Sequence, residues 1–396
     1  MSDVYWDPFD EDIDSDPYDV WRRMRDDAPL YRNDRYDFWA LSRYDDVEAA
    51  SRDVATFSSA HGTVLEFMGP APLRQVGIIF MDPPEHTRLR SLVSRAFTPR
   101  RVTDLEPTIR ELCAEMLDAQ RDSESFDYLK DFGARLPSRV ISALFGVSPT
   151  DQPWVHEKID LVFHIEPGVG MVNDISFNAQ IELNQYIAGQ MRERMDSPRD
   201  DLMTALTEAE VKEDDGTVRR LTLEEGTTFA NLLISAGTET VGRLLGWTAV
   251  LLAAHPDQRA DLAADPALVP NAVEELLRYE APSPVQGRWV VRSVELHGEK
   301  LEPESKVLLL TGSAGRDERR FPDADRFDVH RHIDHHVAFG HGIHFCIGAA
   351  LARLEGRVAI EETLARFPTW EVDHDRAVRL HTSTVRGYSS VPIVVG

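Results

Sequence analysis

One stretch of the sequence, from Leu221 to Pro256, constrains the fold more than any other. Thr222 and Glu225 have the spacing of a capping box at its start, and Pro256 marks its end. A continuous helix over this stretch would be about 50 Å long, which is enough to cross a whole domain. Its residues are apolar on most sides, so we expect the helix to run through the core.

The centre of this predicted helix carries small and polar residues, namely Gly237, Thr238, Glu239 and Thr240. Apart from the glutamate, each of them costs free energy inside a helix. A buried helix interrupted in this way indicates that something packs against it, or that chemistry takes place there.

Shorter signals elsewhere predict a mainly α fold with a minor β portion. Cys113 lies beside the apolar face of one amphipathic stretch and is expected to be buried and unreactive. There is no internal repeat or long linker, so residues 1–396 are expected to form a single domain with an acidic N-terminal segment over about residues 1–16. The expected elements are helices at 105–118, 271–281 and 349–367, strands within 288–314 with turns at 297–298 and 303–304, and coil at 316–332.

Charge, apolar runs and cysteine content indicate the compartment of the protein and its partners. Asp and Glu number 68 against 43 Lys and Arg, a formal net charge of −25, which disfavours nucleic acid and anionic membranes. The longest apolar run, Leu244 to Ala254, is well short of the roughly twenty residues of a membrane span. The start of the chain lacks the pattern of a secretory signal, and two cysteines fit a reducing compartment. We therefore expect a cytoplasmic monomer.

A histidine-rich segment precedes Cys346. A structural zinc site needs about four nitrogen or sulfur ligands in closely spaced pairs, and this segment has no second cysteine. The pattern therefore disfavours structural zinc. The histidines expected to be solvated loop residues are His330, His332, His335 and His336.

Cys346 differs from these histidines because glycines surround it and a predicted helix follows. Gly340, Gly342 and Gly348 allow the backbone to approach a large flat partner closely. The start of a helix is expected to stabilise the thiolate and lower the pKa of Cys346. Such a thiolate suits either a haem axial ligand or a catalytic nucleophile.

The pattern Phe339-x-x-Gly342-x-x-x-Cys346-x-Gly348 resembles the haem-ligand loop of the cytochrome P-450 superfamily. Three further motifs follow that family's order: Ala236-Gly237-Thr238-Glu239-Thr240 resembles the oxygen-activation motif, Glu275-Leu276-Leu277-Arg278 resembles Glu-x-x-Arg, and Arg326 matches the third member of a Glu-Arg-Arg network. The resemblance extends from about Pro17 onward and is closest to soluble bacterial members. It implies a cytochrome P-450 fold, with a long central helix over a haem and a small β-rich portion.

The resemblance also implies roles for single residues. Cys346 would be the thiolate ligand of haem iron, with Phe339 shielding the sulfur, and Glu239 and Thr240 would deliver protons during dioxygen activation. Alternatively, Thr240 donates only to the carbonyl of Ala236. Glu275, Arg278 and Arg326 would be architectural. The remaining haem-binding residues would be Gly340, Gly348 and Ala236, with His86, Arg90, Arg288 and His344 holding the propionates.

The substrate is expected to be a mostly apolar small molecule of secondary metabolism, such as a terpenoid, steroid, aromatic or polyketide-like compound. Residues 58–84 mix apolar side chains with glycine and proline, as a mobile pocket wall does, and the less regular residues 159–187 would form a lid. The apolar candidates in the wall are Val64, Leu65, Phe67, Met68, Ile78, Ile79, Phe80 and Met81.

Electrons must come from another protein, because the chain has neither a dinucleotide-binding loop nor cysteines for an iron–sulfur cluster. We expect a ferredoxin with its NAD(P)H-dependent reductase. The arginines expected to form its docking patch are Arg88, Arg90, Arg95, Arg100 and Arg101, together with Arg353 and Arg357.

The leading hypothesis is a haem-thiolate monooxygenase that hydroxylates or epoxidises its substrate. The same fold could instead serve a peroxygenase or an oxidative coupling or desaturating enzyme, although the Glu239-Thr240 pair favours dioxygen. A haem-based ligand sensor and a cysteine-nucleophile enzyme without haem are further alternatives. The colour and ferrous–CO spectrum of the purified protein distinguish the last of these.

Overall fold

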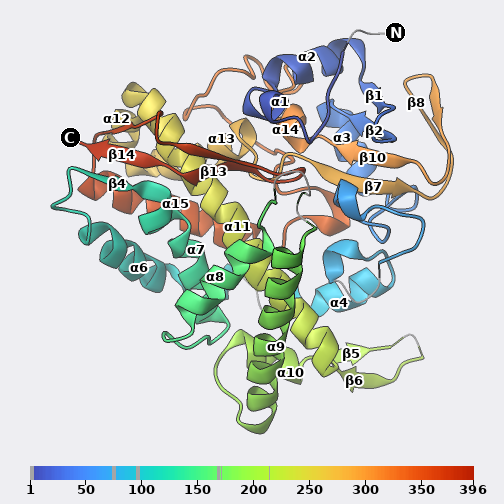
Figure 1. The fold of residues 1–396 in the computed structure, drawn as a ribbon, viewed down its shortest axis with the longest axis horizontal. Helices are drawn as coiled ribbons and strands as arrows, with labels where there is room; N and C mark the ends of the chain where they lie inside the picture. The colour runs from blue at the N-terminus through green and yellow to red at the C-terminus, as the bar shows by residue number, and fades with distance from the viewer. Residues whose placement is uncertain (1–3, 74–76, 95–98, 167–169, 171, 214) are drawn as a thin grey trace.

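The computed structural model describes residues 4–73, 77–94, 99–166, 170, 172–213 and 215–396. The chain is mainly helical, with a smaller β portion, as predicted (Figure 1). The helices are α1 (Glu11–Ser15), α2 (Tyr18–Asp27), α3 (Tyr44–Arg52), α4 (Glu85–Ser94), α5 (Pro99–Thr103), α6 (Glu106–Asp118), α7 (Arg135–Leu144), α8 (Gln152–Val162), α9 (Asp174–Asp196), α10 (Leu202–Glu208), α11 (Leu223–Ala254), α12 (Pro256–Ala264), α13 (Val269–Tyr279), α14 (Thr311–Gly315) and α15 (Ala349–Arg366).

Short helical turns and strands complete the described chain. The turns are η1 (Leu65–Phe67), η2 (Ile78–Phe80), η3 (Leu129–Gly133), η4 (Pro266–Leu268) and η5 (Gly342–His344). The strands are β1 (Leu30–Asn33), β2 (Phe38–Leu41), β3 (Phe57–Ser58), β4 (Ser125–Asp127), β5 (Glu210–Lys212), β6 (Val218–Arg220), β7 (Gln286–Val290), β8 (Val294–Leu296), β9 (Glu299–Leu301), β10 (Lys306–Leu309), β11 (Trp370–Val372), β12 (Val378–His381), β13 (Arg386–Ser390) and β14 (Pro392–Val395).

The predicted central helix is α11, which runs diagonally through the middle of the molecule (Figure 1). The hydroxyl of Thr222 accepts a hydrogen bond from the Glu225 N–H at 3.1 Å, and the Glu225 carboxylate accepts one from the Thr222 N–H at 2.8 Å. This confirms the capping box. Apolar side chains of α11 enter two core clusters, one shared with α6 and α15 and the other with α8 and α9, so this helix joins the two.

The main sheet has the strand order β1-β2-β10-β7-β3, with β2 and β10 parallel and the other neighbours antiparallel. The predicted turns are confirmed between β8 and β9 and between β9 and β10. His297, Gly298 and Glu304 each have a positive φ there. The sequence reasoning missed β1 and β2, and also β11 to β14, because these strands are short and their alternation is weak.

One regional prediction needs correction. Residues 159–187 are not irregular, because α8 and α9 cover most of their described part and Asn173 caps α9. Within the acidic N-terminal segment, Trp6 is buried with apolar residues of the main sheet. Cys113 is fully buried, as predicted, and burial raises the pKa of its thiol.

The expected Glu-Arg-Arg network is present with a different third member. The carboxylate of Glu275 accepts two hydrogen bonds from Arg278, at 2.6 and 2.7 Å, and both side chains are fully buried. Arg331, not Arg326, is the second guanidinium, 3.3 Å from Glu275. The Arg326 side chain is 69% exposed and contributes only its carbonyl oxygen to the cluster.

None of the helices in the described ranges combines the length and apolar character needed to cross a lipid bilayer.

Candidate active site

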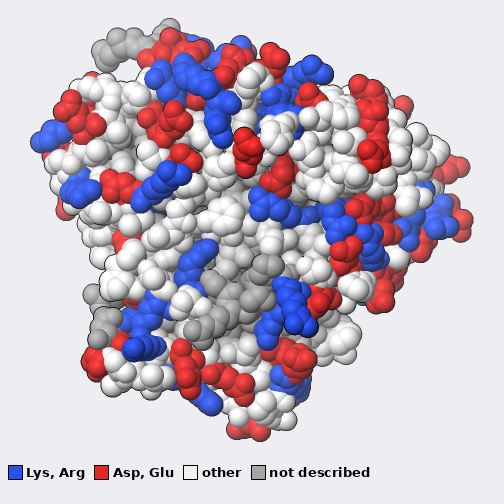
Figure 2. All heavy atoms as spheres, turned by 180° about the vertical axis from the view of Figure 1, so that it is seen from behind, with Lys and Arg blue, Asp and Glu red and all other residues white. Residues whose placement is uncertain are grey.

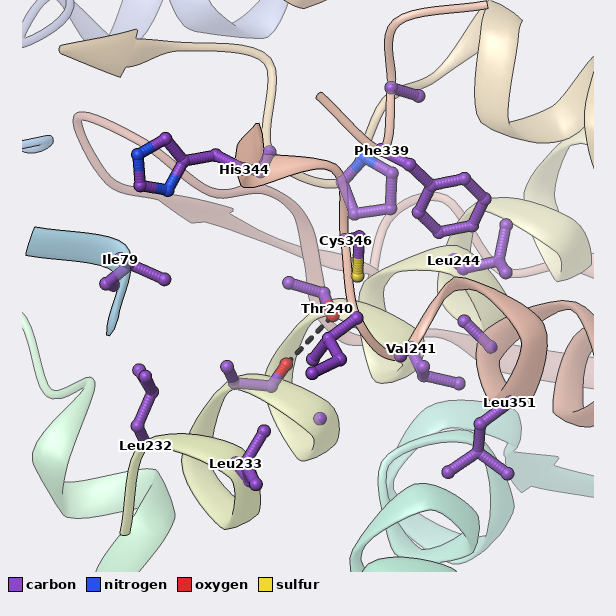
Figure 3. Close-up of a pocket in the computed structure, with 18 of the residues that line it drawn as sticks. Ile79, Leu232, Leu233, Thr240, Val241, Leu244, Phe339, His344, Cys346 and Leu351 are labelled. Carbon is purple, nitrogen blue, oxygen red and sulfur yellow. Dashed lines mark hydrogen bonds between the residues drawn. The ribbon is translucent and has the colours of Figure 1, made fainter. Parts of the chain in front are cut away.

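A cavity of about 260 Å³ lies between α11, the loop that carries Cys346, and α15 (Figure 3). Its wall is mostly apolar. Polar groups enter it at a few points, including Thr240, Ser283 and Gln286. The residues that α11 supplies are Leu232, Leu233, Ala236, Gly237, Thr240, Val241 and Leu244.

Cys346 reaches this cavity from a loop with a tightly fixed backbone. Gly342 has a φ of +70°, and a Cβ atom there would lie 2.8 Å from the Ser51 carbonyl oxygen, so only glycine fits. The Cys346 N–H donates to the Phe339 carbonyl at 2.8 Å. Its sulfur points into the cavity toward α11 (Figure 3).

The predicted lowering of the Cys346 pKa is wrong for the protein alone. Cys346 is exposed to the cavity, but desolvation by the surrounding protein raises the pKa of its thiol, and the Gly348 N–H, Arg90 and Arg353 only partly offset this effect. Helix α15 begins at Ala349, and the backbone N–H that lowers the pKa of Cys346 belongs to Gly348, the residue before the helix.

Phe339 lines the cavity beside Cys346, as Figure 3 shows. Its ring meets the ring of Phe345 edge-on at 6.2 Å between centroids. The guanidinium of Arg353 lies over the Phe339 ring, 4.6 Å from its centroid, and donates to the Glu274 carboxylate at 2.6 Å. These contacts fix an apolar ring next to the sulfur.

Four nitrogen-bearing side chains converge near the opposite end of the Cys346 loop. His86 and Arg90 come from α4, Arg288 from β7, and His344 from η5. The rings of His86 and His344 lie 4.3 Å apart, and the Arg90 guanidinium donates to the Phe345 carbonyl.

His86 and Arg288 are buried, whereas Arg90 and His344 are half-buried. Within the described ranges, both ring nitrogens of His86 and Nε2 of His344 have no hydrogen-bond partner. Burial lowers the pKa of His86 to about 4, and burial with the nearby cations lowers the pKa of His344 to about 2. Burial also lowers the pKa of Arg288 to about 10. Such a cluster is suited to bind carboxylate groups.

The structure brings Thr240 to the cavity but not Glu239. The Thr240 hydroxyl faces the same space as the Cys346 sulfur and donates to the Ala236 carbonyl at 2.9 Å (Figure 3). Glu239 lies on another face of α11, is 5% exposed, and pairs with Arg243 at 2.9 Å. Thr240 therefore makes the hydrogen bond to the Ala236 carbonyl that was the alternative to a role in proton delivery, and α11 continues without a break.

Most of the residues that were predicted to form an apolar wall do not line the cavity. Of the eight candidates, Ile78 and Ile79 line the cavity. Leu65 and Met68 pack instead against the main sheet, and Phe67 is 41% exposed. The wall comes mainly from helices, because regular apolar faces cover more surface than a short loop.

Comparison with known proteins decides the family. The Cytochrome P450 family model matches residues 30–390. The chain belongs to the cytochrome P450 family. It is 42% identical to the protein named cytochrome P450 123 of Mycobacterium tuberculosis, over 98% of this chain and 96% of that protein. It is 38% identical to erythromycin C-12 hydroxylase of Saccharopolyspora erythraea, over 94% and 93%. The solved structure of cytochrome P450 CYP109Q5 from Chondromyces apiculatus matches with a TM-score of 0.87 at 35% identity, over 98% and 97%.

This P450 is accordingly a monooxygenase that carries haem with a cysteine thiolate as iron ligand, and it uses dioxygen and a redox partner. The residues present fit that group. A thiol faces a mostly apolar cavity, and the cluster of His86, Arg90, Arg288 and His344 offers cationic and hydrogen-bonding partners for two propionates.

Glu355 is a cavity residue that the sequence reasoning missed. It is fully buried on α15, its Oε2 atom has no hydrogen-bond partner among the described residues, and burial raises its pKa to about 8. The available signal was its position four residues after Leu351, on the apolar face of that helix.

His336 also departs from prediction. It is 3% exposed, and its Nε2 atom lies 3.1 Å from the Glu274 carboxylate. The expectation of a solvated histidine is therefore wrong at this position. His330 and His332 are exposed, as predicted.

Proposed function

We propose that this P450 inserts one oxygen atom of dioxygen into an unactivated C–H bond or a double bond of a mostly apolar small molecule. The observation that carries the proposal is the placement of the Cys346 sulfur and the Thr240 hydroxyl across one apolar cavity. Haem, when bound, supplies the activation of dioxygen and the transfer of the oxygen atom.

The protein would hold haem at two points. Cys346 provides the iron ligand, while Phe339 excludes water from the sulfur and keeps its surroundings apolar. His86, Arg90, Arg288 and His344 bind the propionates. The ring nitrogens of His86 and the Nε2 atom of His344 have no hydrogen-bond partner among the described residues, so these two rings can gain one when the carboxylates enter.

Thr240 would handle protons at the distal side of the cavity. Its hydroxyl is held by the Ala236 carbonyl and can exchange that partner for water or an oxygen atom in the cavity. Glu239 remains the proposed proton source on the far side of α11. Its ion pair with Arg243 has to open for it to act in that way.

The cavity lining supports a largely apolar substrate with few polar groups. The relative from Saccharopolyspora erythraea is named a hydroxylase of erythromycin, which is consistent with a role for this P450 in secondary metabolism. Ser283 and Gln286 are the polar side chains available to orient a hydroxyl or carbonyl of the substrate.

The proposed electron donor is a ferredoxin with its NAD(P)H-dependent reductase. On the face shown in Figure 2, basic side chains lie among acidic ones in several places, so basic areas persist despite the net charge. Several predicted docking residues are engaged elsewhere, since Arg353 pairs with Glu274 and Arg357 with Glu106, and Arg90 lines the cavity. Arg95 lies outside the described residues. Arg100 and Arg101 are exposed and carry the docking proposal.

A titration of the ferric protein with apolar metabolites tests the substrate class. We expect a saturable shift of the haem from low to high spin when a compound fills the cavity and displaces water. Turnover of that compound with a ferredoxin system should then yield a product with one added oxygen atom, derived from dioxygen. Binding without such a product, or turnover that requires only peroxide, would contradict the proposed reaction.

A further inference from the structure

Two histidines and a glutamate meet outside the cavity, where α3 lies against the loop before Cys346. The Nε2 atom of His335 lies 2.9 Å from the Nδ1 atom of His341. The Oε1 atom of Glu48 lies 3.7 Å and 3.8 Å from these two nitrogen atoms. All three side chains are partly buried, which restricts their movement.

These separations match those of ligand atoms around one tetrahedral ion. With metal–ligand bonds of about 2.0–2.1 Å, neighbouring ligand atoms lie about 3.3 Å apart, and the observed values fall on either side of this figure. Two imidazoles suit zinc and its transition-metal neighbours, whereas magnesium and calcium prefer oxygen ligands alone. We propose that Glu48, His335 and His341 bind Zn²⁺, with water as the fourth ligand.

Arg52 contacts two of these three side chains and stabilises their metal-free arrangement. Its Nε atom lies 2.6 Å from Nε2 of His341, and its Nη2 atom lies 3.3 Å from Oε1 of Glu48. In this arrangement His341 accepts from Arg52 at Nε2 and donates from Nδ1 to His335. Zinc at Nδ1 requires the proton on Nε2, so Arg52 has to turn away. Its side chain is 58% exposed and has solvent to turn into.

Zinc at this position would tie α3 to the loop that carries the cysteine. The two segments already touch, because Gly342 packs against the backbone of Ser51 and Arg52. The ion adds a second connection one residue earlier, at His341. Bound zinc therefore stabilises the loop and slows the loss of haem. This inference does not depend on the proposed function, since it requires neither substrate nor turnover.

The test is calorimetric titration of Zn²⁺ into the haem-loaded protein, prepared without a histidine tag and treated with a chelator. We expect saturable binding of one equivalent, and slower transfer of haem to an acceptor protein when zinc is bound. His335→Ala and Glu48→Gln should abolish the saturable binding. Arg52→Ala should tighten it, because the competing cation is removed. The matched control is His332→Ala, from the same loop, where the side chain is 88% exposed.

The visible haem spectrum of each variant verifies that it is folded and loaded. If His335→Ala fails this check, Glu48→Gln and Arg52→Ala still decide the question, because both residues lie on α3 and outside the cavity. Absence of saturable binding by the parent protein would overturn the site. So would undiminished binding by Glu48→Gln, or an equal loss in His332→Ala.

Discussion

At the scale of single residues, the side chains of Thr240 and Thr238 make the same kind of hydrogen bond but lie on different sides of α11. Both hydroxyls donate at 2.9 Å to a carbonyl four residues earlier, but Thr240 lines the cavity and Thr238 is buried away from it. We expect Thr240→Ala to divert electrons to hydrogen peroxide and lower product formed per NAD(P)H by about tenfold or more. Thr238→Ala should keep near-normal coupling. Equal peroxide yields from the two variants would argue against a proton-handling role for Thr240.

Glu355, a second single residue, makes the stability of the fold depend on pH. Because burial raises its pKa from 4.5 to about 8, the folded chain retains a proton that the unfolded chain loses between these values. This residue therefore lowers the stability of the fold progressively as the pH rises through that window. Glu355→Gln has no proton to lose, so its melting temperature should exceed that of the parent more at pH 8 than at pH 5. A gain in melting temperature that does not depend on pH would contradict the raised pKa of Glu355.

At the scale of elements, the Glu275 cluster joins α13 to the segment before the cysteine loop. Glu275→Ala leaves Arg278 buried without its carboxylate, at a cost of about 3–5 kcal/mol, so we expect little haem-loaded protein. Arg331→Ala should be clearly destabilising, because its guanidinium lies 3.3 Å from the buried carboxylate. Arg326→Ala should change the free energy of unfolding by less than about 0.5 kcal/mol. Denaturant titrations compare the variants, and a larger loss for Arg326→Ala would restore the sequence-based assignment.

The same cluster shows where reasoning from sequence stops. Helix α11, its cap and the loop around Cys346 follow from spacing, capping and glycine content, which are local properties. The partner of Glu275 could not be chosen locally, because Arg326 and Arg331 occupy one irregular segment and only the fold decides which side chain turns inward. Glu355 escaped notice for a related reason. A single carboxyl on a helix is read as solvated until packing buries it.

At the scale of the whole molecule, net charge and local charge have separate consequences. The chain carries a formal charge of −25, so its acidic surface repels acidic proteins unless a basic area guides them. Reversing Arg100 and Arg101 to Glu should slow reduction by ferredoxin at low salt, and added salt should reduce the difference. The control reverses Arg35 and Lys300, which are 69% and 64% exposed in the β-rich part of the chain. Equal slowing by both pairs would assign the effect to net charge instead of docking.

The two core clusters that share α11 also bear on the molecule as a whole. We propose that residues 1–396 unfold as one domain. Helix α11 contributes side chains to both clusters, so unfolding of one cluster would also disrupt the other. Calorimetry of the haem-loaded protein should show a single transition. Two separated transitions would indicate that the helical and β-rich parts are independent.

The central claim is that Cys346 is the thiolate ligand of haem in the described cavity. The ferrous–CO spectrum tests it most directly, because the position of its main band reports whether a thiolate is a ligand of the haem iron. The parent protein and Cys113→Ser should both give the thiolate-type band, since Cys113 is buried away from the cavity. Cys346→Ser should lose that band even where it retains haem. A thiolate-type band that survives in Cys346→Ser, or is absent from the haem-loaded parent, would contradict the account.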